Sequence, residues 1–140
     1  MEIYEEVLDV IAEAAEKASD REIGGMLGAD RGGSICQVVV DHSTSNKRHT
    51  YAPNVDWLNH IIGSRRNWCF SGLFHTHLNN QSTLSVGDRT YIKEILMAMP
   101  SDIAYLYFPL YVLPQKKLYA FKAERVNGEI IITEESVNII

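Results

Sequence analysis

The sequence contains little cysteine, no long apolar run and no excess of basic residues, and each of these features excludes a class of protein. Two cysteines, Cys36 and Cys69, are too few for a disulfide framework, so we expect both to be reduced core residues. No apolar stretch approaches the length of a membrane span. The acidic N-terminus, with Glu2, Glu5 and Glu6, differs from signal and transit peptides, which favours a cytoplasmic protein.

The charge and the size of the chain narrow the classes further. The net charge is -5, and the basic residues are scattered in pairs, which argues against a nucleic-acid-binding protein. The 140 residues are enough to bury a core, and the hydrophobic fraction of 46% is that of an ordinary globular protein. We therefore expect residues 1–140 to form a single domain.

The spacing of apolar residues predicts helices and strands in alternation. Helices are predicted over residues 3–18, 55–64 and 86–99. Strands are predicted over residues 22–28, 35–40, 70–76, 103–108, 117–124 and 130–133. Pro109 and Pro114 limit a further strand, residues 110–113, to a sheet edge or a bulge. The pattern predicts an α/β fold with a curved, mostly antiparallel sheet flanked by helices.

The most informative stretch runs from residue 69 to residue 88, where His75 and His77 alternate at the end of a predicted buried strand. Residues i and i+2 of a strand share a face, so the two rings lie close together. Two neutral imidazoles side by side form half of a zinc site. An isolated His-x-His pair is a weak indication, because strand histidines are more often simply packed or hydrogen-bonded.

Ser85 and Asp88 stand at the start of the third predicted helix. The helix dipole keeps a carboxylate in the first turn ionised, so Asp88 can supply a third ligand. The same pair also fits a capping box with Asp in place of Glu, and taken alone that interpretation is the commoner one. The two histidines and the acid together favour a three-ligand zinc site, in which water takes the fourth position.

A catalytic zinc also needs a base, which should be a carboxylate that is not itself a ligand. Glu22 stands at the head of a run with glycines at 24, 25 and 28, typical of a buried strand that another backbone approaches closely. This assignment requires the Glu22 strand to lie beside the histidine strand.

The order of these residues is similar to the signature of the JAMM (MPN-plus, JAB-type) zinc metalloproteases. That signature is a glutamate opening a glycine-rich strand, then His-x-His, seven residues, Ser, two residues and Asp. Here it stands as Glu22, His75-Thr76-His77 and Ser85-Val86-Gly87-Asp88, with Leu78 where the family usually has Pro. The resemblance covers most of the chain and implies an MPN/JAB-like (cytidine-deaminase-like) fold of minimal, prokaryotic type.

The resemblance also implies a role for each residue of the motif. His75, His77 and Asp88 would bind Zn²⁺, and Glu22 would be the general base that also hands the proton to the leaving amine. Ser85 would stabilise the oxyanion of the tetrahedral intermediate. The activity implied is zinc-dependent hydrolysis of amide bonds, including isopeptide bonds, after the C-terminal glycines of ubiquitin-like proteins.

The implied partner is a ubiquitin-like or sulfur-carrier protein with a diglycine tail, whose identity the sequence leaves open together with the oligomeric state. His49 and Tyr51 lie in a region that borders the substrate groove in the family, so they are candidates for substrate contact. An exposed loop without a role is an equally good interpretation of these two residues.

Two other functions are open to the same sequence. Some members of the family have lost the metal and serve only as protein-binding scaffolds, but a scaffold has no need to retain all five motif residues. A purely structural zinc is disfavoured, because such a site is usually closed by four protein ligands and no fourth Cys or His is conveniently placed.

Overall fold

The computed structural model describes residues 1–42, 51–65 and 67–140. Within them the helices are α1 (Glu5–Lys17), α2 (Val55–Ser64) and α3 (Val86–Ala98). The strands are β1 (Glu2–Ile3), β2 (Gly24–Ala29), β3 (Ile35–Val40), β4 (Cys69–His77), β5 (Tyr105–Tyr107), β6 (Leu110–Val112), β7 (Lys117–Val126), β8 (Glu129–Glu135) and β9 (Asn138–Ile139). In these described residues, no helix combines the length and the apolar character needed to cross a membrane.

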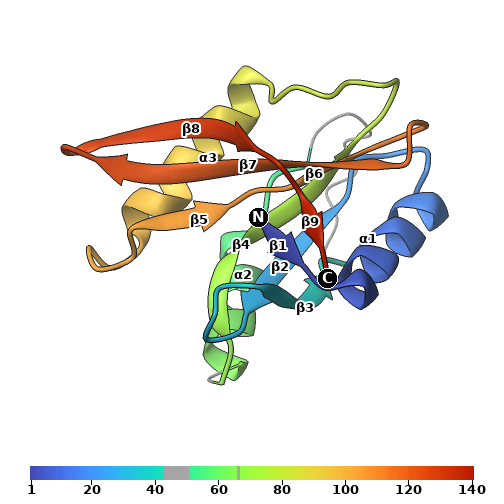
Figure 1. Cartoon of the computed structure of the whole chain (residues 1–140). Helices are drawn as coiled ribbons and strands as arrows, with labels where there is room; N and C mark the ends of the chain where they lie inside the picture. The colour runs from blue at the N-terminus through green and yellow to red at the C-terminus, as the bar shows by residue number, and fades with distance from the viewer. Residues whose placement is uncertain (43–50, 66) are drawn as a thin grey trace.

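The strands form one mixed sheet in the order β5-β7-β6-β4-β2-β3-β1-β9, with β8 paired to β7. The longer pairings, β2 with β3 and β4 and β7 with β8, are antiparallel. β5 and β6 act as one interrupted strand, because both pair with β4 on one side and with β7 on the other. The sheet is strongly curved, so that β2 and β3 run across the direction of the β7–β8 hairpin (Figure 1).

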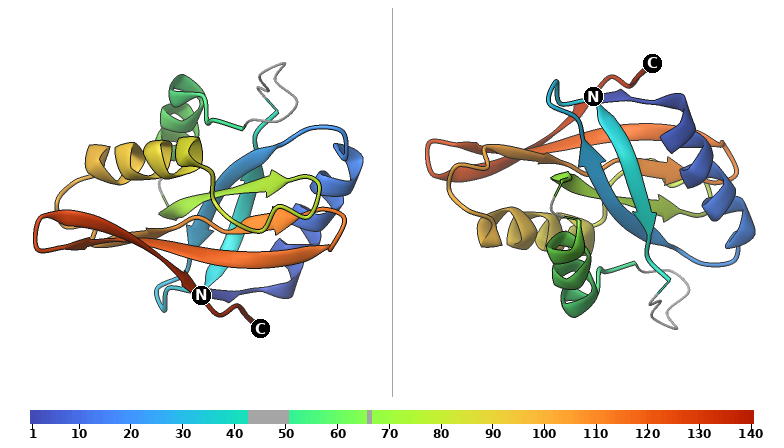
Figure 2. Two further views of the ribbon diagram at one scale, coloured as in Figure 1. Left: turned by 90° about the horizontal axis from the view of Figure 1, so that it is seen from above. Right: turned by 90° about the horizontal axis from the view of Figure 1, so that it is seen from below.

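Helices cover both faces of this sheet (Figure 2). On one face, Val7, Ile11 and Ala15 of α1 pack with Leu27 and Phe74. On the other face, α2 and α3 form a second core cluster with the strands. Its fully buried members include Leu73, Ile92, Leu96, Phe108 and Leu110. Because Leu73 faces the α3 side and side chains alternate along a strand, His75 and His77 face α3 as well.

The predicted α/β class, with a curved and mostly antiparallel sheet between helices, is confirmed. The helix over residues 55–64 has the predicted bounds, and the side chain of Asn54 caps it by accepting a hydrogen bond from Trp57 N–H. Asn127 and Gly128, between β7 and β8, both have positive φ, 51° and 81°, as a type I′ hairpin turn requires. Glycines 24 and 25 lie where a neighbouring backbone comes close, as the sequence predicted.

The predicted start of the first helix was wrong by two residues. Ile3 was assigned to it because its spacing matches the apolar stripe, but Ile3 lies in β1, where it pairs with Ile35 and Ile139. The helix therefore begins at Glu5. Pairing with two distant strands outweighs the local helical pattern here, and the pattern alone does not reveal those strands.

Two further predictions were wrong. The strand between Pro109 and Pro114 lies inside the sheet, because both prolines fall just outside β6 and remove no donor from its ladder. Pro109 even contributes its carbonyl oxygen, which accepts from His75 N–H at 3.2 Å. The cysteines are free but are not core residues, since Cys69 is exposed at the start of β4 and Cys36 is half-buried.

Candidate metal centre

The pairing of β2 with β4 brings Glu22, which precedes β2, next to the strand that carries His75 and His77. Gly24 is opposite His75 in the antiparallel register. Hydrogen bonds continue this register beyond the end of β2, since Thr76 N–H donates to Ile23 O at 2.8 Å and Ile23 N–H donates to Thr76 Oγ1 at 2.9 Å. Glu22 therefore stands opposite His77, and the adjacency required of a base and its metal site is present.

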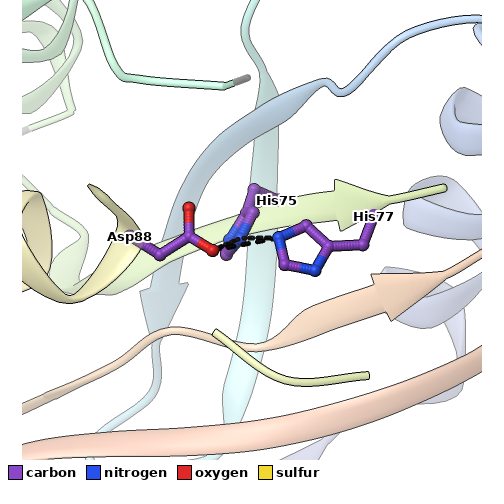
Figure 3. A group of neighbouring side chains, drawn as sticks. All are labelled: His75, His77 and Asp88. Atoms are coloured by element: carbon purple, nitrogen blue, oxygen red, sulfur yellow. Dashed lines mark hydrogen bonds and ion pairs between the residues drawn. The ribbon is translucent and has the colours of Figure 1, made fainter. Parts of the chain in front are cut away.

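Three side chains from β4 and α3 converge on one point (Figure 3). His77 Nε2 lies 2.9 Å from Asp88 Oδ2 and 3.1 Å from His75 Nε2. The third edge, from His75 Nε2 to Asp88 Oδ2, measures 3.3 Å. All three residues are buried, with exposed fractions of 0%, 1% and 4% for His75, His77 and Asp88. Two nitrogens and one oxygen thus form a compact triangle closed off from most of the solvent.

The size of this triangle matches a tetrahedral zinc site. Zinc–nitrogen and zinc–oxygen bonds of about 2.0–2.1 Å place tetrahedral ligand atoms about 3.3 Å apart. The edges of 2.9, 3.1 and 3.3 Å are close to that spacing. The group can therefore hold a metal ion with only small adjustments of its side chains.

The chemistry of the three ligand atoms also favours a bound cation. His77 Nδ1 lies 3.0 Å from Gln81 O, and since a carbonyl can only accept, Nδ1 carries a proton. When neutral, His77 therefore presents the lone pair of Nε2 to the carboxylate of Asp88, and when protonated it donates to that carboxylate from Nε2. Two acceptors at such a distance repel each other unless a cation, either a proton or a metal ion, lies with them.

The charges around the triangle favour an ionised Asp88. Burial opposes its charge, but hydrogen bonds from His75, His77 and Ser85 N–H outweigh burial and hold the pKa of Asp88 well below its usual range. Burial likewise lowers the pKa of His75 and keeps that ring neutral. For His77 the effect of burial is outweighed by the hydrogen bond to Asp88 and the negative charge of Glu22, so its pKa is raised.

The capping box predicted as an alternative is also present. Ser85 Oγ accepts from Asp88 N–H at 3.0 Å, and Asp88 Oδ2 accepts from Ser85 N–H at 2.9 Å. The two interpretations of this segment are therefore compatible, because the oxygen that caps α3 also faces both histidines. Ser85 itself is exposed, and its hydroxyl, which accepts from the backbone, keeps its own proton free to donate outward.

Glu22 lies at the edge of the triangle and is half-buried. Burial raises its pKa to about 7, although the positive charge of His77 and a hydrogen bond from Tyr51 N–H to Oε1 at 3.2 Å lower it. A carboxylate with a pKa near neutrality can both take up and release a proton under physiological conditions, as a general base requires.

Tyr51 packs against Gly24 and is not an exposed loop residue. Its side chain is 4% exposed, and its hydroxyl donates to Asp41 Oδ2 at 2.9 Å. Its ring occupies the space that a side chain at Gly24 would fill. Contact of Tyr51 with a substrate stays a prediction, and His49, the other candidate, lies outside the described residues.

Sequence reasoning missed two contacts that orient the histidines. The Gln81 carbonyl depends on the conformation of the loop after β4, for which the sequence gives no signal. Tyr91, whose hydroxyl lies 3.1 Å from His75 Nδ1, falls within the helix predicted over residues 86–99 but was not identified as a site residue. Its position three residues after Asp88 could have identified it, because residues i and i+3 are neighbours on a helix surface.

No family model and no curated protein sequence matches this chain. Solved structures are similar to it over nearly its whole length. Protein DSY2949 from Desulfitobacterium hafniense is 18% identical with a TM-score of 0.69, covering 99% of this chain and 92% of its own. AF2198, a JAB1/MPN domain protein from Archaeoglobus fulgidus, is 16% identical with a TM-score of 0.58, covering 100% of this chain and 97% of its own. The chain therefore has an MPN-like fold that carries a buried His-His-Asp group able to hold a metal ion.

Proposed function

We propose that this chain is a zinc-dependent peptidase or isopeptidase of the JAMM type. The observation that carries the proposal is the convergence of His75, His77 and Asp88 on one point, with Glu22 opposite His77. A metal held by three protein ligands keeps a position open for water, as catalytic zinc sites do. A bound zinc ion supplies Lewis-acid chemistry, since it lowers the pKa of water from about 15.7 towards 7 and polarises a carbonyl.

The residues around the metal group supply the general base and the group that stabilises the oxyanion. Glu22, with its pKa of about 7, accepts the proton of the attacking water and then delivers it to the leaving amine. Ser85, whose exposed hydroxyl is free to donate, stabilises the negative charge that develops on the carbonyl oxygen. The helix dipole of α3 supports that charge at the same place.

The substrate class we propose is a ubiquitin-like or sulfur-carrier protein with a diglycine tail. A tail without side chains can lie extended along a sheet edge and enter a narrow groove. The amide bond after the second glycine would be the bond that is cleaved, either to a lysine amine or to a following residue.

The first test measures metal content in the wild type and in Asp88→Asn. Asparagine retains an oxygen that can accept from Ser85 N–H, so the cap of α3 is kept while the charge is lost. We expect one zinc ion per wild-type chain by elemental analysis, and far less in the variant. A folded wild type that takes up no metal from a zinc-containing buffer would contradict the proposal and favour a non-catalytic scaffold.

The second test measures hydrolysis. Fusions in which a diglycine-tailed ubiquitin-like protein precedes a short reporter peptide are incubated with the wild type, the chelator-stripped wild type and Asp88→Asn. Cleavage after the second glycine that requires zinc and Asp88 is expected. If the zinc-loaded protein cleaves none of a panel of such fusions, the proposed substrate class is wrong.

A further inference from the structure

The two histidines of the metal group are oriented by partners of different chemistry. His77 Nδ1 faces the carbonyl oxygen of Gln81, which can only accept a hydrogen bond. His75 Nδ1 instead lies 3.1 Å from the hydroxyl of Tyr91, which can either accept or donate. The rings of His75 and Tyr91 meet edge to face at 76°, with centroids 6.0 Å apart.

Tyr91 reaches His75 from a firmly packed helix. It stands three residues after Asp88 on α3, so one face of this helix supplies both a metal ligand and the partner of another ligand. The next residue, Ile92, and Leu96 one turn later are both 0% exposed and anchor α3 in the core. The hydroxyl therefore has a fixed place relative to the triangle.

The hydroxyl group also has the right protonation state. A phenol has an ordinary pKa of about 10, so at neutral pH the Tyr91 hydroxyl has a proton to donate and lone pairs to accept a hydrogen bond. When His75 binds a metal through Nε2, its proton is on Nδ1 and needs an acceptor. His75 is 0% exposed, so water does not readily replace Tyr91 in that task.

We propose that Tyr91 is a positioning residue of the metal centre, whose hydroxyl oxygen accepts a hydrogen bond from Nδ1–H of His75 and holds Nε2 towards the ion. The inference rests on the metal site of the proposed function but requires no catalysis. Without a metal, the same hydroxyl can donate to Nδ1 and satisfy the other tautomer of His75. Tyr91 thus serves both states of the ring, whereas Gln81 O serves one state of His77.

The test compares Tyr91→Phe with Tyr119→Phe. Both variants remove one hydroxyl and keep the ring, but the Tyr119 hydroxyl donates to Gln115 on the exposed surface. Zinc affinity is measured by competition with a chromophoric chelator. Loss of a group that orients a metal ligand typically weakens binding about 10–100-fold, which is the change expected for Tyr91→Phe, against none for Tyr119→Phe.

Two further measurements separate positioning from simple stabilisation. A structural role would lower the melting temperature of the metal-free and zinc-loaded proteins equally, whereas a positioning role reduces the rise in melting temperature that zinc produces. In zinc-loaded wild type, a slowly exchanging Nδ1 proton of His75 is expected by ¹⁵N–¹H NMR, and in Tyr91→Phe it should exchange faster.

The outcomes are distinguishable. If zinc binds the wild type and Tyr91→Phe with equal affinity and the His75 Nδ1 proton is equally protected, the positioning role is overturned and the metal site stands. If the wild type binds no zinc, both the positioning role and the proposed function are overturned.

Discussion

The metal side of the site, made of His75, His77 and Asp88, differs from its base side, Glu22, in how firmly it is held. The three metal-side residues are buried on β4 and α3 and are joined by hydrogen bonds to one another. Glu22 is half-buried, lies ahead of β2, and accepts a hydrogen bond from Tyr51 N–H. The difference implies that the two proposed roles, metal binding and proton transfer, can be disrupted separately, and each prediction below tests that separation.

The largest separation is expected from Glu22→Gln. The amide fills the same space but accepts no proton, so turnover should fall by roughly 10²–10⁴ if Glu22 is the general base. Zinc affinity should change little, because the metal-side residues are untouched. Turnover of the diglycine fusion and zinc affinity are measured on the same samples, and a fully active Glu22→Gln would remove Glu22 from the mechanism.

A smaller effect is expected from Gly24→Ala, which crowds the base side. An added Cβ would lie 2.4 Å from the ring of Tyr51 and 2.6 Å from Phe74 O, so the ring or the strand must move. We expect a loss of about 1–3 kcal/mol in the free energy of unfolding and lower turnover as Tyr51 shifts away from Glu22.

Gly63→Ala on α2 is the matched control, since a Cβ there meets no atom within 4 Å among the described residues. Gly63 is the next-to-last residue of α2, so alanine there should stabilise the protein by at most about 0.5–1 kcal/mol, the value for a helix interior. Urea unfolding of Gly24→Ala, Gly63→Ala and the wild type measures both changes in the free energy of unfolding. Equal stability of Gly24→Ala and wild type would show that Tyr51 moves freely and does not position Glu22.

The base side should also give the metal-free protein a pH-dependent stability. The pKa of Glu22 is about 7 in the folded state against an ordinary value of 4.5, so folding favours the protonated acid. The stabilisation is complete below the unfolded pKa and is lost as the pH rises through about 7. Because the carboxyl is only half-buried, we expect a loss of about 1–2 kcal/mol between pH 4.5 and pH 8.

Glu22→Gln should abolish this component. Urea unfolding of the metal-free wild type and variant at both pH values provides the measurement, with the difference between the two proteins expected at pH 8 and not at pH 4.5. An identical pH dependence in the two proteins would mean that Glu22 titrates as an ordinary exposed acid.

The smallest effect concerns the loop that aims His77. Asn79 and Asn80 both have a left-handed backbone, with φ of 58° and 60°, and the next residue supplies the carbonyl that faces His77 Nδ1. Alanine at either position should cost about 1 kcal/mol, or about fivefold in zinc affinity if the strain moves Gln81. Glycine at both positions adopts this backbone freely and should retain wild-type affinity.

Zinc affinity is measured by chelator competition for two double variants, one with alanine and one with glycine at both Asn79 and Asn80. A double-glycine variant that binds as weakly as the double-alanine variant would assign the effect to the lost Asn side chains and not to the backbone.

The convergence of His75, His77 and Asp88 could be predicted from the sequence because their geometry is local. The period of two along β4 aligns His75 with His77, and a capping position fixes Asp88 on the first turn of α3. The place of Glu22 followed only from a required adjacency, which the β2–β4 register then supplied.

Features that depend on distant segments were missed. β6 lies inside the sheet because it pairs with β4 on one side and with β7 on the other. The prolines near its ends had instead suggested a sheet edge or a bulge. Tyr51 is buried because its hydroxyl donates to Asp41 and its ring packs where Gly24 has no side chain. In both cases tertiary packing overrides a local pattern, and a single sequence does not contain the pairing that decides it.

Asp88 Oδ2 accepts a hydrogen bond from the backbone and also faces the candidate metal position, so the backbone amide should respond to metal binding. Ser85 N–H donates to this oxygen, which also faces the two histidines. A cation on Oδ2 draws electron density from it and weakens the bond from Ser85, so the amide resonance of Ser85 should move upfield. One backbone signal in a ¹⁵N spectrum thus records occupancy of the metal centre without a substrate, a chelator or an added label on the site itself.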